Sequence, residues 1–359
     1  MHFRVTLLAG LSLAVSSSVP LPVVTGQLYD VTPLPFFNTR GAALSNNGVV
    51  AGGIAHTDGS VSLGEWLNGV LTNLGAPPNL PSDFNRVRPF GINDCGVIVG
   101  TVHRSAGGVP SRTFIYNRGR FTVLPLVDPL DLGGVAIGIN NRGEVVGYDI
   151  TFNNEEKGWL WSNGAYFSLP VDGNNTAALG INSSGTVIGN RSLNLAYEQT
   201  QDEFCCMGER GYIATRGRSQ YLSGFVYAIN DRGEAAGGAS SAGHSVATVF
   251  QDGIATVILT LPSFAVGINS FGEVVGSYEP AGYNGRRVFI WSANSGAFDV
   301  TPGGFRYAEG AAVNARGEVL AFGETADGTF HYFLLIPRSA GALTPKRVSS
   351  VRPTSILLR

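Results

Sequence analysis

The sequence predicts an all-β protein: a seven-bladed β-propeller of four-stranded antiparallel blades, with the ring closed by the N-terminal strand. Three observations lead to this prediction. The 359 residues include 49 glycines, and only 14% of them are charged, a composition that favours short strands and tight turns over helices. One segment recurs seven times along the chain. Finally, a strand left over at the N-terminus matches a strand that the last repeat lacks.

The recurring segment has the pattern Gly-Ile-Asn-x-x-Gly-x-Val-Val-Gly. Its copies lie at 43–52, 91–100, 138–147, 180–189, 228–237, 267–276 and 312–321. We number the repeats 1 to 7 by the residue at the Asn position, which is Ser45, Asn93, Asn140, Asn182, Asn230, Asn269 and Asn314 in turn. These positions are 39 to 48 residues apart, which is the length of a four-stranded propeller blade.

Each copy is predicted to form a β-hairpin. A short apolar strand (strand A) ends at Ile-Asn, Asn-x-x-Gly makes the turn, and Val-Val-Gly lies in the return strand (strand B). Asn side chains bond to nearby backbone groups in turns, and Gly adopts a positive φ without steric cost. The predicted turn residues are Asn93, Gly96, Asn140, Gly143, Asn182, Gly185, Asn230, Gly233, Asn269, Gly272, Asn314 and Gly317.

A second hairpin follows in each repeat. Its first strand (strand C) is aromatic and leads into a turn that contains Gly, as in FIYNRG (114–119), WLWSNG (159–164) and FIWSANSG (289–296). Its return strand (strand D) commonly ends at Leu-Pro or a similar break, as at 123–126 and 168–170. Each repeat therefore supplies four antiparallel strands, which a propeller blade requires.

The two ends of the repeat region predict how the ring closes. Repeat 7 has a strand B and a strand C (331–337) but no good strand D. The segment QLYDVTPLP (27–35) precedes the first strand A and resembles FDVTPGG (298–304) of repeat 6. We expect residues 28–34 to complete the last blade, which also protects an exposed sheet edge. An open β-solenoid is the alternative and needs no such exchange.

These motifs resemble the HAF-type extracellular repeat proteins of bacteria. The resemblance rests on the GIN-x-x-G-x-VVG segments, the aromatic strand of the FIW type and the D-[LV]-x-x-L/P strand, and it covers roughly residues 27–337. It implies a secreted repeat protein. It implies no shared reaction or ligand, because the family is defined by its repeat. Repeats 1 and 7 depart from the pattern at Ser45 and Ala321, and repeat 4 carries an insertion (190–210).

Three segments are predicted along the chain: a signal peptide (1–26), the repeat domain (27–337) and a flexible basic tail (338–359). The apolar run Val5–Val15 follows a weakly basic start and is too short for a comfortable membrane span. Export is therefore expected, to the periplasm or the cell exterior, with no membrane span after the signal is removed. An uncleaved anchor or a buried strand remains the alternative reading of this run.

The charge distribution argues against nucleic acid as a partner. The leader and the tail hold six of the 24 Lys and Arg residues and no acid, which leaves 18 basic residues against 26 acidic ones in the repeat domain. Phosphate binding needs clustered basic side chains.

A monomer is expected, and the partners to consider are a carbohydrate or a protein at the cell exterior.

Neither the cysteines nor the histidines form a recognisable site. The adjacent Cys205 and Cys206 cannot form an unstrained disulfide, and Cys95 lies in another repeat. The histidines outside the leader are spread over separate repeats, without His-x-His or HExxH spacing. We predict no catalytic residue, no metal and no cofactor.

Function is expected on the variable loops. A–B and C–D turns share one side of a propeller and are short in this chain, whereas the B–C and D–A loops on the other side vary. Variable loops on a rigid scaffold commonly carry binding sites. The candidate ligand-face residues are Arg86, Arg88, His103, Asp128, Trp159, Tyr283 and Arg286.

Three functions remain open on this basis. We favour an extracellular binding or adhesion scaffold that uses the variable-loop face. A structural surface protein without a ligand is the first alternative. A polysaccharide hydrolase or lyase is the second, because the sequence positions of the acidic residues in a ring do not reveal whether two carboxylates lie at a catalytic distance from each other.

Overall fold

The computed structural model describes residues 21, 28–37, 41–105, 109–173, 175–192, 209–241 and 243–338. The predicted signal peptide (apart from Leu21), the predicted tail after Arg338, and Cys205 and Cys206 lie outside these residues. All elements of the described residues are β-strands, which confirms the predicted all-β class. None of these residues belongs to a helix long and apolar enough to cross a membrane.

Repeats 1 to 6 form their strands in the predicted A-B-C-D order, and repeat 7 forms strands A, B and C. Strand A is β2 (Ala42–Leu44), β6 (Phe84–Ile92), β10 (Gly133–Ile139), β14 (Thr176–Ile181), β18 (Phe225–Ile229), β22 (Ser263–Ile268) and β26 (Phe305–Val313) in repeats 1 to 7. Strand B is β3 (Val50–Ala55), β7 (Ile98–Arg104), β11 (Val145–Ile150), β15 (Val187–Ser192), β19 (Ala235–Ser241), β23 (Val274–Tyr278) and β27 (Val319–Thr325).

The second hairpin of each repeat supplies the two outer strands. Strand C is β4 (Val61–Leu67), β8 (Ser111–Asn117), β12 (Glu156–Ser162), β16 (Glu209–Thr215), β20 (His244–Gln251), β24 (Arg287–Ser292) and β28 (Phe330–Pro337). Strand D is β5 (Val70–Gly75), β9 (Arg120–Val123), β13 (Ala165–Ser168), β17 (Arg218–Tyr221), β21 (Ile254–Val257) and β25 (Gly296–Asp299) in repeats 1 to 6. In repeat 7 the outermost strand is β1 (Tyr29–Leu34).

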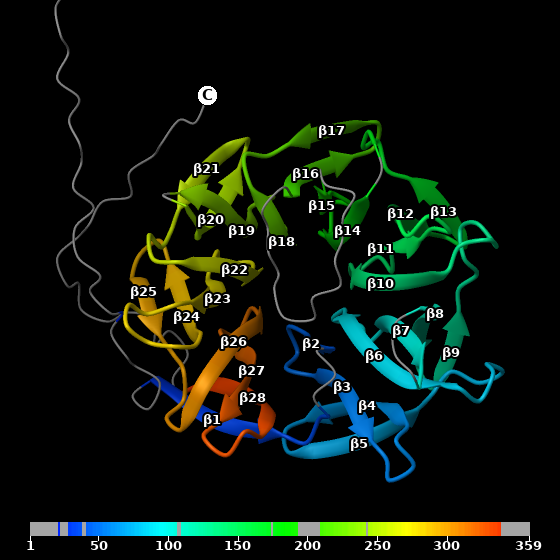
Figure 1. Ribbon diagram of the computed structural model, residues 1–359, viewed down its shortest axis with the longest axis horizontal. Helices are drawn as coiled ribbons and strands as arrows, with labels where there is room; N and C mark the ends of the chain where they lie inside the picture. Colours follow the sequence, from blue (N-terminus) through cyan, green and yellow to red (C-terminus); the bar gives the residue numbers. More distant parts are fainter. Residues whose placement is uncertain are drawn as a thin grey trace, which may run out of the picture.

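These four-stranded sheets radiate from a common centre. Figure 1 shows strand A of each repeat nearest the middle and strand D at the rim. Single parallel pairs, Val61 with Arg86 and Lys157 with Thr176, connect repeat 1 to repeat 2 and repeat 3 to repeat 4. The architecture is that of a β-propeller.

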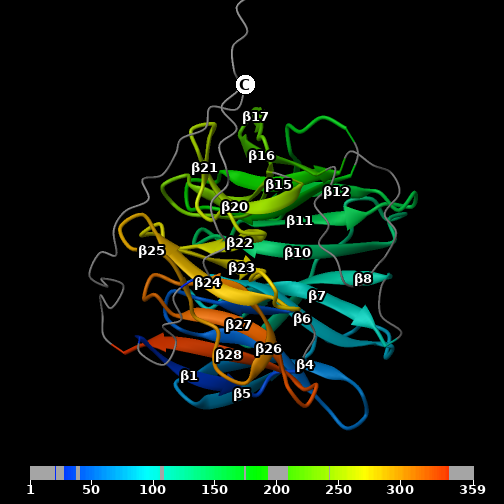
Figure 2. The same ribbon diagram turned by 60° about the vertical axis from the view of Figure 1, so that its left-hand side comes forward.

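The predicted pairing between the two ends of the repeat region is confirmed. β1 runs antiparallel to β28, with Tyr29 opposite Pro337 and Leu34 opposite Tyr332, and Figures 1 and 2 show the two strands side by side. Tyr29 and Leu34 are buried. The pairing therefore supplies both an edge strand and apolar packing to repeat 7.

The hydrophobic core lies between neighbouring sheets. One cluster, for example, joins Val99 and Ile115 of repeat 2 to Ala136, Val145 and Trp159 of repeat 3. The equivalent clusters follow at the next junctions along the chain. Because each repeat buries its apolar surface against its neighbours, the repeats depend on one another for stability.

The last glycine of the repeat motif makes room for two neighbouring strands. A Cβ on Gly147 would lie 2.0 Å from the backbone oxygen of Val135 on strand A and 2.9 Å from the ring of Trp159 on strand C. Repeat 7 has Ala321 at this position, and its cross-strand partner is the glycine Gly310. In repeat 7 the glycine of this strand pair therefore lies on strand A and not on strand B.

Candidate binding site

The two ends of strand A separate two sides of the molecule. In repeat 3, β10 ends at Ile139, and the turn that begins at Asn140 follows it. The loop 124–132, between β9 and β10, lies at the opposite end of the same strand. A strand of seven residues is about 23 Å long, so this distance separates the loop from the turn. We call the side with the A–B turns the turn side, and the side with the B–C and D–A loops the loop side.

Each turn asparagine bonds within its own turn. The Oδ1 atom of Asn93 accepts hydrogen bonds from the backbone N–H groups of Cys95 (3.1 Å) and Val97 (2.9 Å). Its backbone oxygen accepts one from the N–H of Gly96, which has a φ of 77°. The same bonds recur at Asn182, whose Oδ1 accepts from Ser184 and Thr186. The turn thus has the local structure that the sequence predicts for Asn-x-x-Gly.

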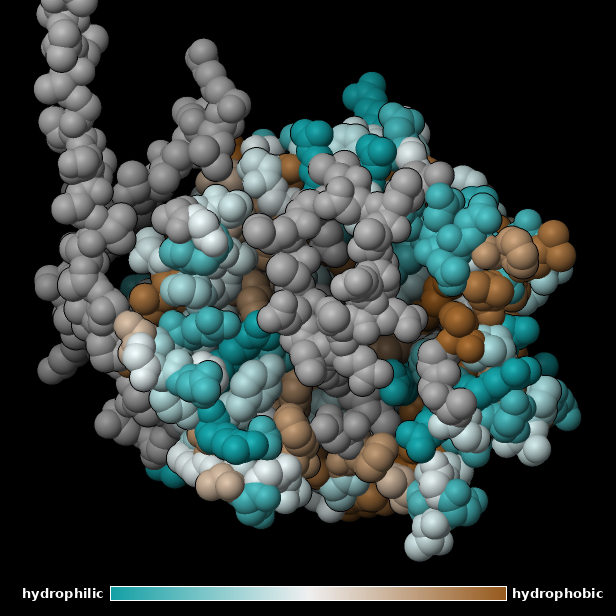
Figure 3. Space-filling model, in the orientation of Figure 1, coloured by the Kyte–Doolittle hydropathy of each residue, from teal (hydrophilic) through white to brown (hydrophobic). Residues whose placement is uncertain are grey.

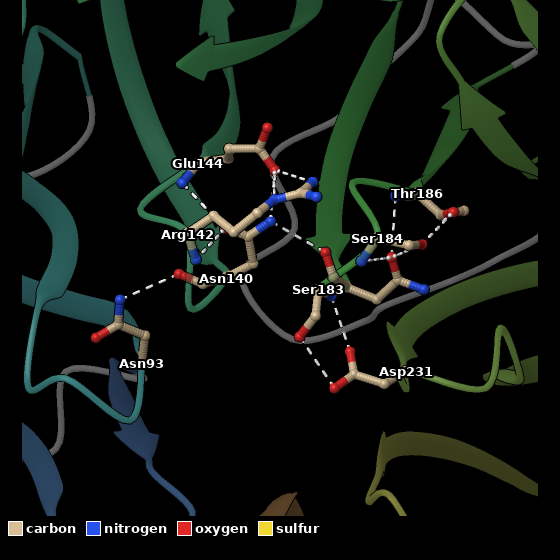
Figure 4. A network of polar contacts seen from close by, with 9 residues as sticks. Asn93, Asn140, Arg142, Glu144, Ser183, Ser184, Thr186 and Asp231 are labelled. Carbon is tan, nitrogen blue, oxygen red and sulfur yellow. Dashed lines mark hydrogen bonds and ion pairs between the residues drawn. The ribbon is translucent and has the colours of Figure 1, made fainter. Parts of the chain in front are cut away.

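The same asparagines also link one repeat to the next. The Nδ2 of Asn93 donates to the backbone oxygen of Asn140, and the Nδ2 of Asn140 donates to that of Asn182, both at 3.0 Å (Figure 4). The series continues from Asn182 to Asn230, Asn269, Asn314 and Ser45 at 2.8–3.1 Å. We call this series the asparagine chain. Sequence reasoning missed it, although the signal was present: one amide side chain at the equivalent place in successive repeats.

The junction between repeats 1 and 2 is built differently, because Ser45 has no amide to donate. There the Nδ2 of Asn46 donates to the carboxylate of Asp94 (3.2 Å), and the Nδ2 of Asn47 donates to its backbone oxygen (2.8 Å). Asn141 of repeat 3 donates to the same carboxylate at 2.8 Å. Asp94 therefore connects three successive turns.

Arg-x-Glu pairs complete the turn side in repeats 3, 5 and 7. Arg142 lies 2.6 Å from the carboxylate of Glu144, which also accepts a hydrogen bond from Asn140 Nδ2. Burial tends to raise the pKa of Glu144, but the hydrogen bonds from Arg142 and Asn140 outweigh it and hold the pKa below its ordinary value. The Arg142 guanidinium also reaches the next turn, where a Cβ on Gly185 would lie 2.6 Å from it. These contacts give the turn side a structural role.

The structure places two of the candidate arginines on a strand. The prediction put Arg86 and Arg88 in a D–A loop, whereas both lie within β6 and are partly buried. Arg86 is opposite His103 of β7 in the sheet register. The strand begins earlier than expected because the sheet pairing extends back to Phe84, opposite Arg104.

The predicted place of Trp159 is wrong. The prediction put it on the ligand face, but the structure buries it in strand C, where 2% of its surface is exposed. Its ring lies against Gly147, and its Nε1 donates to Asp149 at 2.8 Å. The glycine of strand B leaves space for the indole, so packing decides the place of this aromatic residue.

Tyr283 and Arg286 belong to an intramolecular network. Arg286 forms ion pairs with Glu279 and Glu309, and its guanidinium lies over the ring of Phe264. Burial opposes its charge, but the bond to Glu309 outweighs it and raises the pKa of Arg286 above its ordinary value. The hydroxyl of Tyr283 donates to the backbone oxygen of Arg306. Both side chains therefore connect repeats 6 and 7.

The loop side of repeat 3 contains a hollow of about 390 Å³, a size within the range of ligand pockets. Its walls come from the β9–β10 and β11–β12 loops, and Asp128 is the candidate residue that lies in it. The lining residues are Asp128, Leu130, Asp131, Thr151, Phe152, Asn153 and Glu155. Sequence reasoning named Asp128 but did not predict that these two loops meet.

The hollow combines exposed apolar side chains with carboxylates. Leu130 is 75% exposed and Phe152 is 74% exposed, and Figure 3 shows hydrophobic side chains gathered over repeat 3. Burial, and then the neighbouring charge of Asp128, raise the pKa of Asp131. Large exposed apolar side chains next to each other are typical of contact sites.

A buried carboxylate holds one wall of the hollow in place. Asp149 is 1% exposed, and it accepts hydrogen bonds from the backbone N–H of Val127 (2.7 Å) and from Trp159 Nε1. Burial raises its pKa. Asp149 thus ties the β9–β10 loop to the sheet, and it is a positioning residue that sequence reasoning missed.

Within the described ranges, no group of three or more His, Cys, Asp and Glu side chains is placed to hold a metal ion. Cys95 is exposed on the turn side.

Comparison with known proteins extends the fold assignment only. No family model matches the chain, and no curated protein matches it. Among solved structures, it is similar to a puromycin-hydrolyzing peptidase of Mycobacterium tuberculosis (TM-score 0.57, 11% identity, 93% of this chain and 54% of that one). It is also similar to an acylaminoacyl peptidase of Pyrococcus horikoshii (TM-score 0.54, 12% identity, 91% and 54%).

The chain therefore spans about half the length of these two peptidases. At such identities the likeness concerns the fold, and the hydrolytic activities belong to those proteins. The lectin SapL1, solved in complex with alpha methyl fucoside, matches at a lower TM-score of 0.40 with 11% identity, over 90% of this chain and 97% of that one.

Proposed function

We propose that the protein is a seven-bladed β-propeller, closed into a ring, that acts as an exported binding module. Contacts between the first and last repeats support the ring. Asn314 Nδ2 donates to Ser45 O at 3.0 Å, and the N–H of Ala315 donates to Asn46 Oδ1 at 2.9 Å. The Arg316 guanidinium occupies the space that a Cβ on Gly48 would need. These contacts repeat those between consecutive repeats.

The binding function is carried by one observation: the apolar and acidic hollow of repeat 3 on the loop side. The turn side is occupied by contacts between repeats, whereas the loop side presents Leu130 and Phe152 to solvent. A fixed ring with an exposed, mixed hollow suits a scaffold that binds a ligand. The resemblance to HAF-type extracellular proteins and the apolar leader support export. The ligand we propose is a carbohydrate or a protein of the cell exterior.

A glycan and protein array tests this function. The wild-type protein is expected to bind a small set of immobilised ligands, and Phe152→Ser and Asp128→Asn are expected to weaken that binding about tenfold or more, because both change hollow residues. Asp252→Asn is the matched control, since Asp252 is an exposed turn residue of repeat 5 with a φ of 50°, which Asn tolerates. Equal binding by all four proteins would refute the site.

A further inference from the structure

We propose that the hollow of repeat 3 binds residues 339–359 of a second copy of this chain, so that copies associate head to tail. The proposal rests on the proposed function in one respect, namely that the hollow is the binding site. It departs from the monomer that the sequence analysis expects.

The chemistry of the hollow selects a basic and partly apolar polypeptide. Asp128, Asp131 and Glu155 line it, and Lys157 is the cation whose charge acts on Asp131. The apolar walls are Leu130 and Phe152. A neutral sugar would bring no positive charge to these carboxylates and would meet a single aromatic ring, that of Phe152. A basic segment with apolar side chains compensates the charge and covers the apolar walls.

The segment 339–359 has this composition. It contains Lys346, Arg347, Arg352 and Arg359 and no acidic residue. Between these residues it carries Val348, Val351 and Ile-Leu-Leu at 356–358. The repeat domain as a whole is acidic, so its net negative charge also attracts the basic segment before the two come into contact.

The place where the chain leaves the ring favours a second copy. The Cγ atom of Pro337 lies 3.5 Å from the position that a Cβ on the turn glycine Gly317 would occupy. The asparagine chain places that turn on the same side as the Asn140 turn, and the hollow lies at the opposite end of β10. The segment therefore starts on the turn side, whereas the hollow opens on the loop side.

This geometry suits copies stacked in the same orientation. The turn side of one copy then faces the loop side of the next, and 21 residues reach about 70 Å when extended. The two surfaces in contact differ, so the association is heterologous and continues beyond two copies.

Sedimentation of the full chain tests the proposal. The average mass of the wild type is expected to rise with protein concentration at low salt and to fall to that of one copy in 1 M salt, where charges are screened. Asp128→Asn with Asp131→Asn (the hollow variant), or Lys346→Glu with Arg347→Glu (the tail variant), should each weaken association about tenfold or more. Asp172→Asn with Asp252→Asn, two exposed aspartates outside the hollow, should leave it unchanged.

Mixing the hollow variant with the tail variant gives the decisive result. At protein concentrations at which the wild type associates, each variant alone is expected to sediment as a single copy. The mixture is expected to form complexes of two copies, because one partner retains a normal tail and the other a normal hollow. A single-copy mass for the mixture, or for the wild type at every concentration, overturns the proposal; the latter is also the result if each tail occupies its own hollow. If the proposal fails while the array still identifies ligands that depend on Phe152, the proposed function stands without it.

Discussion

The asparagine that begins each turn has bonds in two directions. At Asn140, the Oδ1 atom accepts the N–H groups of Arg142 and Glu144, and the Nδ2 atom donates to Asn182 O of the next repeat. The residue is 4% exposed, so water does not replace these partners. One side chain therefore both shapes its turn and holds two repeats together.

Asn140→Ala tests this double role. The substitution leaves buried backbone groups of two repeats without partners, and each such group costs about 1–3 kcal/mol. We expect the free energy of unfolding to fall by about 3 kcal/mol in urea denaturation. Asn153→Ala is the control, because Asn153 is exposed on the loop side, and it should change stability by less than about 0.5 kcal/mol. A similar small change for both would show that the amide matters little.

The carboxylate of Glu144 makes the turn side sensitive to acid. Its pKa in the folded protein is lowered from the ordinary value of 4.5. A lowered folded-state pKa means that the carboxylate stabilises the protein above the unfolded-state pKa, and that this contribution is lost as the pH falls through the folded-state pKa.

Glu144→Gln should therefore cost stability at neutral pH and progressively less below pH 4.5. The measurement is the unfolding free energy of both proteins at a series of pH values. A difference between the two proteins that stays constant down to the folded-state pKa would contradict the role of the charge.

At the residue scale, the sequence predicted what is local. The Asn-x-x-Gly turns follow from the conformational needs of four neighbouring residues. The asparagine chain does not, since it depends on how one repeat lies against the next. Trp159 and Asp149 show the same limit: their place is decided by a neighbouring strand and by the β9–β10 loop, which composition does not reveal.

At the scale of strands, the glycine of strand B and the aromatic residue of strand C act as a pair. Gly147 is opposite Trp159, and Gly276 is opposite Phe289. The glycine brings strands A and B close together, and the ring covers the space left by the absent side chain. This explains why the two motifs occur together along the chain.

Gly147→Ala compared with Gly143→Ala separates packing from backbone strain. The new Cβ at Gly147 would lie 2.0 Å from a backbone oxygen, which the sheet cannot move away easily. We expect a loss of roughly 3 kcal/mol or more there, the upper end of overpacking costs. At Gly143 nothing lies within 4 Å, and only the φ of 78° is unfavourable, for about 1 kcal/mol. Thermal unfolding measures both, and equal losses would contradict the close approach of the strands.

Strand boundaries were harder to predict than strand existence. Strand D was expected to reach Leu-Pro, but β13 ends at Ser168 and β9 at Val123. In repeat 3 the pairing of strand D with β12 covers residues 165–168, and the residues after them leave the sheet to enter the next D–A loop. After β9 the chain likewise leaves the sheet, and the loop 124–132 that follows meets the B–C loop of repeat 3 at the hollow. The candidate site therefore depends on loop conformations that the repeat pattern does not encode.

At the scale of the molecule, the ring is the proposed feature on which the binding site and the head-to-tail association depend. The place of the N-terminal strand was predictable because the motif repeats. Repeat 7 lacks a strand and the N-terminus has an extra one, so the extra strand was expected to complete repeat 7. The proposed binding site and the proposed direction of head-to-tail association both depend on the division into a turn side and a loop side.

The distance between repeat 1 and repeat 7 tests this claim most directly. Asn47→Cys and Ala315→Cys, in a background with Cys95, Cys205 and Cys206 replaced by Ser, place two spin labels on turns that the contact between Ala315 and Asn46 brings together. Pulsed electron spin resonance should give one narrow distance at the short end of its range. A long or broad distance would mean that repeats 1 and 7 lie at opposite ends of an open array, and it would contradict the ring.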